Sequence, residues 1–342
     1  MFTDDLLKWY DRNRRDLPWR GTRDPYRVWL SEIMLQQTQA ETVKGYYARF
    51  LACFPTVEKL AGADEQDVLK LWEGLGYYSR ARHLHAAAKY VAGELGGAFP
   101  ADAGGLRTLP GVGPYAANAI ASIVYGESVP ALDGNQARVL ARVLAWESAL
   151  RTPFDRRAPA LSLMDRERPG DYNQALMDLG ATVCTPRNPA CGACPVSAHC
   201  LARAGDAALD FPRKRAPAAK RTQDWTILPV FVDGKVLTRK RPAGLLGGLY
   251  EFCAVQGHPE GEALREALMT LGLEDAQVVE RLPDARHVFT HLVWRMRGWR
   301  VRASNVPAGF TPVDADGLRA LPFPGALRVY RDAVQDILKE KM

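Results

Sequence analysis

The sequence predicts two domains, an all-α domain followed by a small α+β domain. Up to about residue 204, apolar residues recur with the period of an amphipathic helix, and beyond about residue 224 the period shifts toward the alternation of strands. The stretch between them has few large apolar residues. A chain of 342 residues is long enough to bury two separate cores. We therefore expect domains at residues 1–204 and 225–342, joined by a linker at 205–224.

The composition is typical of a globular protein in water. Apolar residues make up 47% and charged residues 25% of the chain. No apolar run is long enough to cross a bilayer, and the acidic N-terminus lacks the apolar core of a secretion signal. We expect a cytoplasmic protein, associated with the nucleoid of a bacterial cell, with no membrane partner. The net charge of +6 suits a polyanionic partner, although such a charge also serves solubility alone.

The expected linker is strongly basic. Residues 211–221 read FPRKRAPAAKR, with two prolines and five cations. Such a segment either lies near phosphate groups or is a plain solvated tether.

The individual elements follow from the spacing of apolar residues. Asp24 and Pro25 form a good helix start, with an N-cap followed by proline in the first turn. Helical spacing is present at residues 9–15, 24–37, 56–75, 80–95 and 135–146. In the second domain, strands are expected at 224–232, 235–240, 249–255 and 287–301, with one helix at 260–272.

Four cysteines lie close together near the middle of the chain, in the order C-x6-C-x2-C-x5-C: Cys184, Cys191, Cys194 and Cys200. Clustered thiolates are typical of a metal site. A zinc site more often has two matched C-x2-C pairs, whereas this uneven spacing favours a [4Fe–4S] cluster. Zinc remains an alternative, and disulfides are a weaker one because the chain shows no secretion signal. The cluster would staple a loop (184–200) that is poor in apolar residues.

A glycine-rich turn is the second informative motif. In LPGVGP (109–114), Gly111 and Gly113 allow a tight turn between two helices, and a proline suits the first turn of the second helix. The free N–H groups of that turn can hold a DNA phosphate without reading sequence. The same motif also fits an ordinary connection between two helices.

Further along, Asp133 and Asn135 precede a helix, where either residue can serve as an N-cap. The order of these motifs resembles the helix-hairpin-helix DNA glycosylase superfamily of the endonuclease III type, which carries an iron–sulfur loop. Within it, the chain is most similar to the adenine DNA glycosylases of the MutY group. The resemblance rests on the four cysteines and on these motifs: PWR (18–20), VWLSEIMLQQTQ (28–39), GLGYYSRAR (74–82), LPGVGPYAANAI (109–120) and LDGNQARVLAR (132–142).

The resemblance implies two catalytic carboxyl groups. Glu32 lies among apolar residues, which raise the pKa of a carboxyl group, so it can stay protonated and deliver a proton to adenine N7. Asp133 would stabilise or capture the oxocarbenium-like transition state, as the paired acids of glycosidases do. Asn135 would orient Asp133 or the attacking water. The alternative for Glu32 is an exposed helix glutamate.

Tyr115 is expected to decide whether the enzyme has lyase activity in addition to glycosylase activity. Bifunctional relatives carry a lysine in this turn and form a Schiff base with the sugar. A phenol cannot form an imine, so the resemblance implies an enzyme that removes the base and leaves the strand intact. Tyr115 would also hydrogen-bond near Glu32 or adenine, or it simply packs.

Several further residues are expected to contact DNA. Gln36 and Gln37 are amides in an apolar helix, and the resemblance gives Gln37 the role of filling the duplex after the adenine flips out. Tyr77 would stack beside 8-oxoguanine, or it belongs to the core. Arginines are candidate phosphate contacts at five positions: Arg80, Arg82, Arg138, Arg142 and Arg187.

The C-terminal domain resembles a Nudix fold in TRKRPAGLLGGLYEF (238–252), but it lacks the glutamate box that holds the metal of Nudix hydrolases. Nucleotide hydrolysis is therefore not expected. The resemblance implies that Phe289, Thr290 and His291 contact 8-oxoguanine, with the Thr290 hydroxyl where serine is more familiar. Otherwise this segment is just an alternating strand.

Together these features imply a monomeric enzyme that carries a [4Fe–4S] cluster. Its substrate would be double-stranded DNA with adenine opposite 8-oxoguanine or guanine. One alternative is an endonuclease III-like pyrimidine glycosylase with lyase activity, which Tyr115 and the extra domain oppose. The other is a non-catalytic, lesion-binding DNA scaffold, which the presence of both Glu32 and Asp133 opposes.

Overall fold

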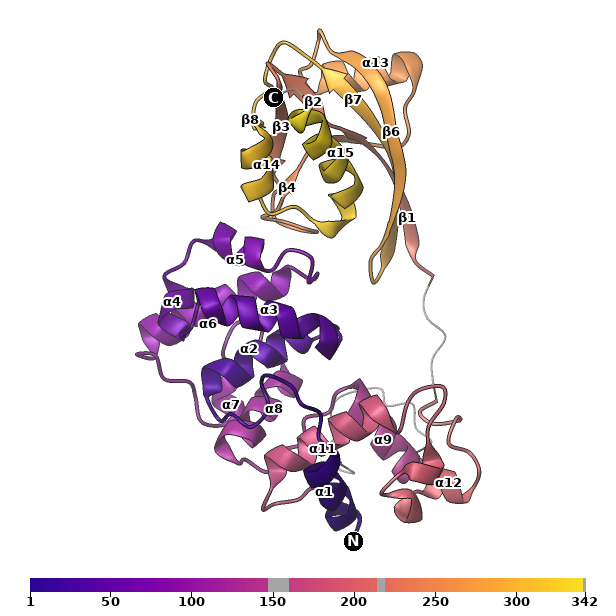
Figure 1. Cartoon of the computed structure of the whole chain (residues 1–342). Helices are drawn as coiled ribbons and strands as arrows, with labels where there is room; N and C mark the ends of the chain where they lie inside the picture. The colour runs from indigo at the N-terminus through magenta and orange to yellow at the C-terminus, as the bar shows by residue number, and fades with distance from the viewer. Residues whose placement is uncertain (147–159, 214–218, 341–342) are drawn as a thin grey trace. The chain divides into compact units, whose positions relative to one another are not determined.

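The structure, a computed structural model, describes residues 1–146, 160–213 and 219–340. The chain divides into two compact units, and Figure 1 colours the chain by residue number, with the C-terminal part of the second unit running to yellow. The first unit comprises Met1–Ala63 and His83–Ala216, and the second comprises Asp64–Arg82 and Pro217–Met342. The second unit therefore includes a helical segment that the sequence analysis placed in the first domain. Part of the expected linker, residues 214–218, lies outside the described residues, and its last residues begin a strand at Arg221.

The first unit is helical, as expected. Its elements are α1 (Phe2–Asn13), α2 (Pro25–Leu35), α3 (Ala40–Cys53), α4 (Val57–Ala61), most of α6 (Ser79–Glu94), α7 (Ala103–Leu106), α8 (Pro114–Tyr125), α9 (Gly134–Val143), α11 (Pro169–Thr182), α12 (Leu201–Ala204), and the 3-10 turns η1 (Cys191–Ala193) and η2 (Ser197–His199). The boundary between the units falls inside α6.

The predicted start of α2 is confirmed. The Asp24 side chain accepts hydrogen bonds from the backbone N–H groups of Tyr26 and Arg27, and Pro25 occupies the first turn. The prediction of one helical segment at 56–75 is wrong. This segment contains two helices, α4 and α5 (Glu65–Leu71). The second begins because Asp64 caps it by accepting a hydrogen bond from the backbone N–H of Gln66.

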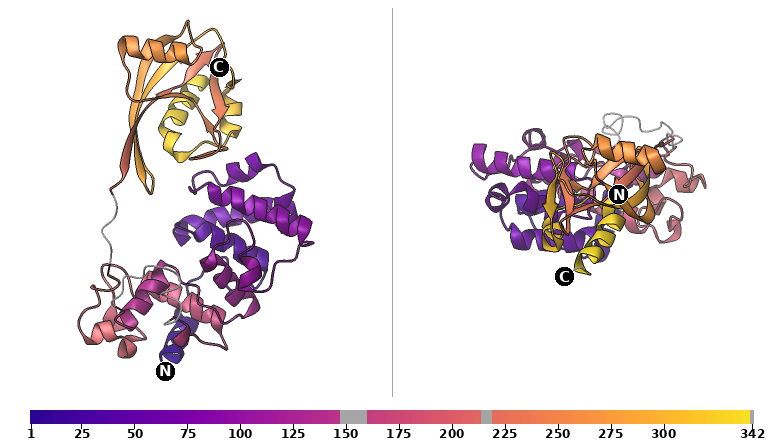
Figure 2. Two further views of the ribbon diagram at one scale, coloured as in Figure 1. Left: turned by 180° about the vertical axis from the view of Figure 1, so that it is seen from behind. Right: turned by 90° about the horizontal axis from the view of Figure 1, so that it is seen from above.

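Two groups of packed helices position the functional residues of the first unit. Helix α2 is buried along nearly its whole length and packs on α8, whose small alanines allow a close approach. Helix α11 packs against α1 and α9, with Leu176 and Leu179 fully enclosed. Figure 2 shows α1 beside α11 when the first unit is viewed from behind. The cavity described below lies where α2, α8, α9 and α11 meet.

The second unit is built on a mixed sheet. Its strands are β1 (Arg221–Leu228), β2 (Val230–Val232), β3 (Lys235–Lys240), β4 (Tyr250–Glu251), β5 (Cys253–Gln256), β6 (Gln277–Val288), β7 (Leu292–Arg302) and β8 (Thr311–Val313). They follow the order β4-β3-β2-β7-β1-β5, with β6 also paired to β7 and β8 to β3. Strands β1 and β2 run parallel to β7, and the remaining pairs are antiparallel.

Helices pack on both faces of this sheet, as Figure 1 shows. The expected helix is present as α13 (Gly261–Thr270), with Leu264 and Leu268 buried on one face. The sequence analysis missed α14 (Ala315–Ala320) and α15 (Arg328–Lys339), which cover the other face. In α15 the buried residues Tyr330, Val334 and Leu338 recur every four residues, so the helical signal was present.

The strand expected at 287–301 is wrong in one respect. Strand β6 ends at Val288 and β7 begins at Leu292, so Phe289, Thr290 and His291 form the turn of a hairpin. The backbone N–H of Phe289 donates to the carbonyl of Leu292 over 2.9 Å and closes this turn. Elsewhere, no helix in the described ranges is long and apolar enough to cross a membrane.

Candidate active site and iron–sulfur loop

One cavity of about 1040 Å³ in the first unit gathers all four predicted catalytic residues and three of the predicted DNA-binding residues. Its walls come mainly from α2, α8, α9 and α11, from the glycine-rich turn and from the segments that flank α2. The predicted residues that line it are Glu32, Gln37, Gly111, Gly113, Tyr115, Asp133 and Asn135. These positions are spread over more than a hundred residues of sequence, and the fold brings them to one place.

Glu32 is the most enclosed acid of this cavity. It lies on α2 and is 4% exposed, which rules out the alternative of an exposed helix glutamate. Burial raises the pKa of Glu32, while a hydrogen bond from Tyr115 partly opposes that shift. The Tyr115 hydroxyl donates to Glu32 Oε2 over 2.7 Å. Burial also raises the pKa of Tyr115 well above its usual range, so the phenol stays protonated as the donor.

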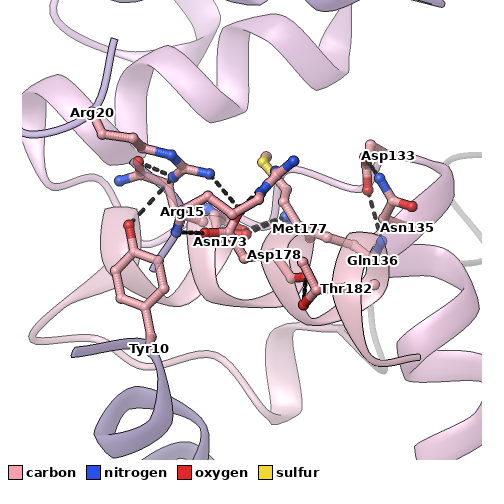
Figure 3. A network of polar contacts seen from close by, with 12 residues as sticks. Tyr10, Arg15, Arg20, Asp133, Asn135, Gln136, Asn173, Met177, Asp178 and Thr182 are labelled. Atoms are coloured by element: carbon pink, nitrogen blue, oxygen red, sulfur yellow. Dashed lines mark hydrogen bonds and ion pairs between the residues drawn. The ribbon is translucent and has the colours of Figure 1, made fainter. Parts of the chain in front are cut away.

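Asp133 faces the same cavity from the start of α9. It is the N-cap of that helix, and its Oδ1 accepts from the backbone N–H of Gln136 over 2.7 Å. Its Oδ2 accepts from Asn135 Nδ2 over 3.0 Å, as Figure 3 shows. Burial raises the pKa of Asp133, and these hydrogen bonds oppose part of that rise. More donors therefore serve Asp133 than Glu32, which favours the carboxylate form of Asp133 and the protonated form of Glu32.

The glycine-rich turn adopts the expected conformation. Gly111 has φ of +75°, in the left-handed region, and a Cβ there would lie 2.5 Å from the Cβ of His83. Gly113 is the N-cap of α8 and has no side chain to bond the free N–H groups of the first turn, which Pro114 begins. Those N–H groups are suited to bind an anion such as a DNA phosphate.

Gln37 follows α2 rather than interrupting it, which corrects the expected extent of that helix. The helix ends at Leu35, and Gln37 has φ of +59°. A left-handed backbone at a non-glycine residue costs on the order of 1–3 kcal/mol and is most frequent at functional sites. Gln37 is exposed at the wall of the cavity, where its amide is accessible to a ligand.

A second cavity, of about 550 Å³, lies within the second unit. Tyr77, Phe289, Thr290 and His291 all line it. The Tyr77 hydroxyl and Thr290 Oγ1 are 3.1 Å apart, within hydrogen-bonding distance. Tyr77 is 45% exposed and has φ of +49°, so the alternative of simple core packing is wrong. The hairpin turn and Tyr77 therefore present a shared polar and aromatic surface.

The four clustered cysteines line one small cavity beside α9 and α11. Burial, with a smaller contribution from the charges of the other three cysteines, raises the pKa of the Cys194 thiol to about 11. Such mutual repulsion disfavours free thiolates and is relieved when they bind metal. All six cysteines of the chain are free of disulfides. In the ranges that the structure describes, no group of three or more His, Cys, Asp or Glu is arranged to hold a single metal ion.

Two of the candidate phosphate-binding arginines instead support this loop. Arg142 is 2% exposed, and its guanidinium donates to Cys184 Sγ over 3.2 Å and to the carbonyl of Thr185 over 2.8 Å. Arg138 donates to the carbonyls of Cys184 and Gly180. Arg80 is also buried, 8% exposed. The prediction of phosphate contacts is therefore wrong for Arg142 and Arg80, since their guanidinium groups are enclosed by protein.

A polar network behind the first cavity was not predicted from the sequence. Arg15, Arg20 and Gln174 line that cavity, and Asp178 lies behind them on α11. A signal was present, because Asp178 interrupts the otherwise apolar stretch around Leu176 and Leu179.

Comparisons with known proteins agree with this arrangement. Residues 30–158 match the HhH-GPD superfamily of base excision DNA repair proteins, and residues 184–200 match the iron–sulfur binding domain of endonuclease III. Residues 227–333 match the NUDIX domain. The chain is 36% identical to the adenine DNA glycosylase of Mus musculus over 375 residues, which cover 92% of this chain and 73% of that protein. The chain belongs to the adenine DNA glycosylase family.

The chain is also similar to adenine DNA glycosylases from other organisms. The chain is 38% identical to the human protein over 354 residues, which cover 85% of this chain and 65% of that protein. It therefore spans slightly less than two thirds of the human protein. It is 41% identical to the Mycobacterium tuberculosis protein over 218 residues, which cover 63% of this chain and 72% of that protein.

Solved structures of other DNA repair enzymes share the fold of part of this chain. A thermostable thymine-DNA glycosylase is 30% identical with a TM-score of 0.55, covering 60% of this chain and 95% of that one. A trapped endonuclease III–DNA covalent intermediate is 19% identical with a TM-score of 0.52, covering 60% of this chain and 94% of that one. The second likeness concerns the fold alone. The iron–sulfur domain and the set of four thiols identify the cofactor as a [4Fe–4S] cluster.

Proposed function

We propose that this protein removes adenine from double-stranded DNA where adenine is mispaired with 8-oxoguanine or guanine, and leaves an abasic site. The observation that carries the proposal is the buried pair of Glu32 and Tyr115, which shares one cavity with Asp133. A protonated acid and an anionic partner at one site are the two groups that hydrolysis of a glycosidic bond requires.

The chemistry follows from the two environments. Adenine flips out of the duplex into the cavity. Glu32 gives its proton to N7, so that the bond between N9 and the sugar C1′ breaks with both electrons leaving on the base. Asp133 stabilises the positive charge that develops on the sugar. A water molecule, oriented by Asp133 and Asn135, then adds to C1′ and releases a proton, which yields the abasic sugar.

The same geometry favours a glycosylase without lyase activity. Cleavage of the strand through a Schiff base requires an amine at the sugar. Tyr115 occupies the start of α8 at the cavity wall, and its hydroxyl is committed to Glu32. A phenol cannot form an imine, so the strand is expected to stay intact after base removal.

The test is a panel of duplexes that carry A:8-oxoguanine, A:G, T:G or thymine glycol, incubated with the full-length protein and separated with and without alkali. We expect cleavage only for the two adenine mispairs and only after alkali. Cleavage at thymine glycol without alkali would instead support a pyrimidine glycosylase with lyase activity. Binding without cleavage of any duplex would support a non-catalytic scaffold.

We further propose that Cys184, Cys191, Cys194 and Cys200 hold the [4Fe–4S] cluster. One cavity holds all four thiols, and the guanidinium of Arg142 lies against Cys184 Sγ, where it offsets the negative charge of a bound thiolate. The cluster, when bound, supplies the cross-link that folds residues 184–200. The surrounding residues Val196 and Leu179 exclude water from it.

The Cys194→Ser variant is expected to lose the cluster, because an alcohol is a far poorer iron ligand than a thiolate. We expect less than half of the wild-type iron per chain and loss of the yellow-brown absorbance, measured on anaerobically purified protein. Cys53→Ser, at an exposed cysteine outside the loop, is the matched control and should keep its iron. Stoichiometric zinc without iron in the wild type would contradict the assignment.

We also propose that the second cavity reads 8-oxoguanine. Phe289 packs edge-on against Trp294, with ring centroids 5.0 Å apart, and the Lys220 ammonium donates to the Phe289 carbonyl over 2.7 Å. These contacts hold the hairpin turn so that the Thr290 hydroxyl, near Tyr77, remains able to bond a ligand. A hydroxyl can distinguish the oxidised edge of 8-oxoguanine from guanine by one added or lost hydrogen bond.

The Thr290→Ala variant is therefore expected to lose part of the preference for A:8-oxoguanine over A:G. One lost hydrogen bond is worth about 1–2 kcal/mol, which corresponds to roughly a five- to thirty-fold lower ratio of single-turnover rates and affinities. Thr290→Ser keeps the hydroxyl and should keep the ratio. An unchanged ratio in Thr290→Ala would mean that this hydroxyl does not read the lesion.

A further inference from the structure

Asp178 is a buried carboxylate with no exposed side-chain surface, located behind the wall of the first cavity. Its Oδ1 accepts from Arg15 Nε over 2.8 Å and from Arg20 Nη2 over 2.9 Å. Its Oδ2 accepts from the backbone N–H of Arg15 over 3.1 Å. Figure 3 shows both guanidinium groups turned toward this one carboxylate. Asp178 therefore fixes two side chains that do line the cavity.

Arg20 is held from several sides. In addition to Asp178, its Nη1 donates to the Tyr10 hydroxyl over 3.3 Å and to Gln174 Oε1. The Arg20 side chain is only 10% exposed, whereas that of Arg15 is 30% exposed. A guanidinium that is this enclosed has little water to screen its charge, so its effect reaches neighbouring groups.

The neighbour that matters is Glu32. The groups that act on it are Tyr115 from α8, Arg20 from the segment before α2, and Asp133 at the start of α9. The charge of Arg20 lowers the pKa of Glu32, and thus works against the protonated form that an acid catalyst needs. The carboxylate of Asp178, bonded directly to Arg20, offsets that charge.

We propose that Asp178 is a positioning residue for adenine excision, which holds Arg20 at the cavity wall and offsets its charge beside Glu32. This inference rests on the proposed function and deepens it. A buried ion pair is often no more stabilising than apolar residues of the same volume, so stability alone gives no reason for a carboxylate at this position. The placement of Arg20 at the cavity wall and the offset of its charge provide such a reason.

The test is the pH dependence of single-turnover adenine excision by full-length Asp178→Asn on an A:8-oxoguanine duplex. Activity falls as pH rises through the pKa of Glu32, because the protonated form is the acid. Removal of the Asp178 charge leaves Arg20 uncompensated and lowers that pKa. The alkaline fall in activity should therefore move to lower pH, by on the order of one pH unit. A role in folding alone would lower the amount of active protein without moving this fall.

Asp171→Asn is the matched control. Asp171 is on the same helix α11, but it pairs with Arg168 at the surface, where both side chains are about 40% exposed. This variant should keep the wild-type pH profile. An Asp178→Asn profile that coincides with those of Asp171→Asn and the wild type would overturn the inference. Failure of the wild type to release adenine at all would instead overturn the proposed function.

Arg15→Met decides the question if Asp178→Asn does not fold, since the Arg15 side chain is partly exposed and its loss should be tolerated. It leaves the whole Asp178 charge to Arg20 and removes one cation near the cavity. The alkaline fall in activity should then move to higher pH, opposite to the Asp178→Asn shift. No movement, or movement to lower pH, would contradict the charge-offset role of Asp178.

Discussion

Glu32→Gln should lower single-turnover excision of adenine by about 10²–10⁴-fold, while binding to the duplex is retained. General acid catalysis contributes an acceleration of this size, and glutamine has the same shape without a transferable proton. Glu94→Gln, at an exposed position near the end of α6, is the control and should retain full activity. Near-normal excision by Glu32→Gln would contradict the assignment of the acid.

The same substitution should not cost stability at neutral pH. Burial raises the pKa of Glu32 in the folded state above its unfolded value. Folding therefore becomes less favourable as pH rises from the unfolded pKa toward the folded one, because the unfolded chain ionises more readily. Glutamine avoids this loss. A Tm equal to or above that of the wild type at pH 8 is expected, as for many sites where activity is maintained at some cost in stability.

Asp133→Asn should lower excision by about 10²–10³-fold, because the positive charge on the sugar loses its anionic partner. Asparagine is as good an N-cap as aspartate, so α9 should still begin at Gly134. This separates the two roles of Asp133, since only the catalytic one needs the charge. Duplex binding and single-turnover rates are the measurements.

The control for Asp133→Asn is Asp102→Asn. Asp102 caps α7 by accepting from the backbone N–H of Gly105 over 2.8 Å, and it lies outside the lining of the cavity. It should keep wild-type excision. Equal losses in both variants would mean that Asp133 acts only through its helix.

Much of the site could be predicted because its signals are local in the sequence. The cap at Asp24, the left-handed glycine at Gly111 and the spacing of the four cysteines each depend on residues a few positions apart. The raised pKa of Glu32 follows from its apolar neighbours on α2. Residues of this kind can be assigned a role before any contact is known.

The parts that sequence analysis missed depend on distant pairs. Arg15 and Asp178 are 163 positions apart, and no periodicity links them. Arg142 was expected at DNA, but its enclosure depends on the cysteine loop and on the carbonyl of Phe211. The turn at 289–291 could not be predicted, because the alternation of apolar residues continues on both sides of it. The pairing of β6 with β7 in the folded sheet sets their register.

The extent of the second unit also could not be predicted from local sequence signals. Its segment Asp64–Arg82 has ordinary helical spacing, and nothing local marks it as separate from the helices before and after it. Within the unit, Lys70 donates to Glu73 and to the carbonyl of Leu321, and Arg331 also bonds Glu73. Burial lowers the pKa of Lys70 to about 8. The bonds from Lys70 to Leu321 and from Arg331 to Glu73 join residues 251 and 258 positions apart, and no local pattern predicts them.

The most direct test of the central claim follows both products of one turnover on a duplex with a single A:8-oxoguanine pair. Free adenine is quantified by chromatography, and strand integrity is measured on the same samples before and after alkali. We expect one adenine released per abasic site, an intact strand before alkali, and no covalent complex after treatment with borohydride. Strand cleavage without alkali together with a borohydride-trapped complex, or abasic sites formed without release of adenine, would contradict it.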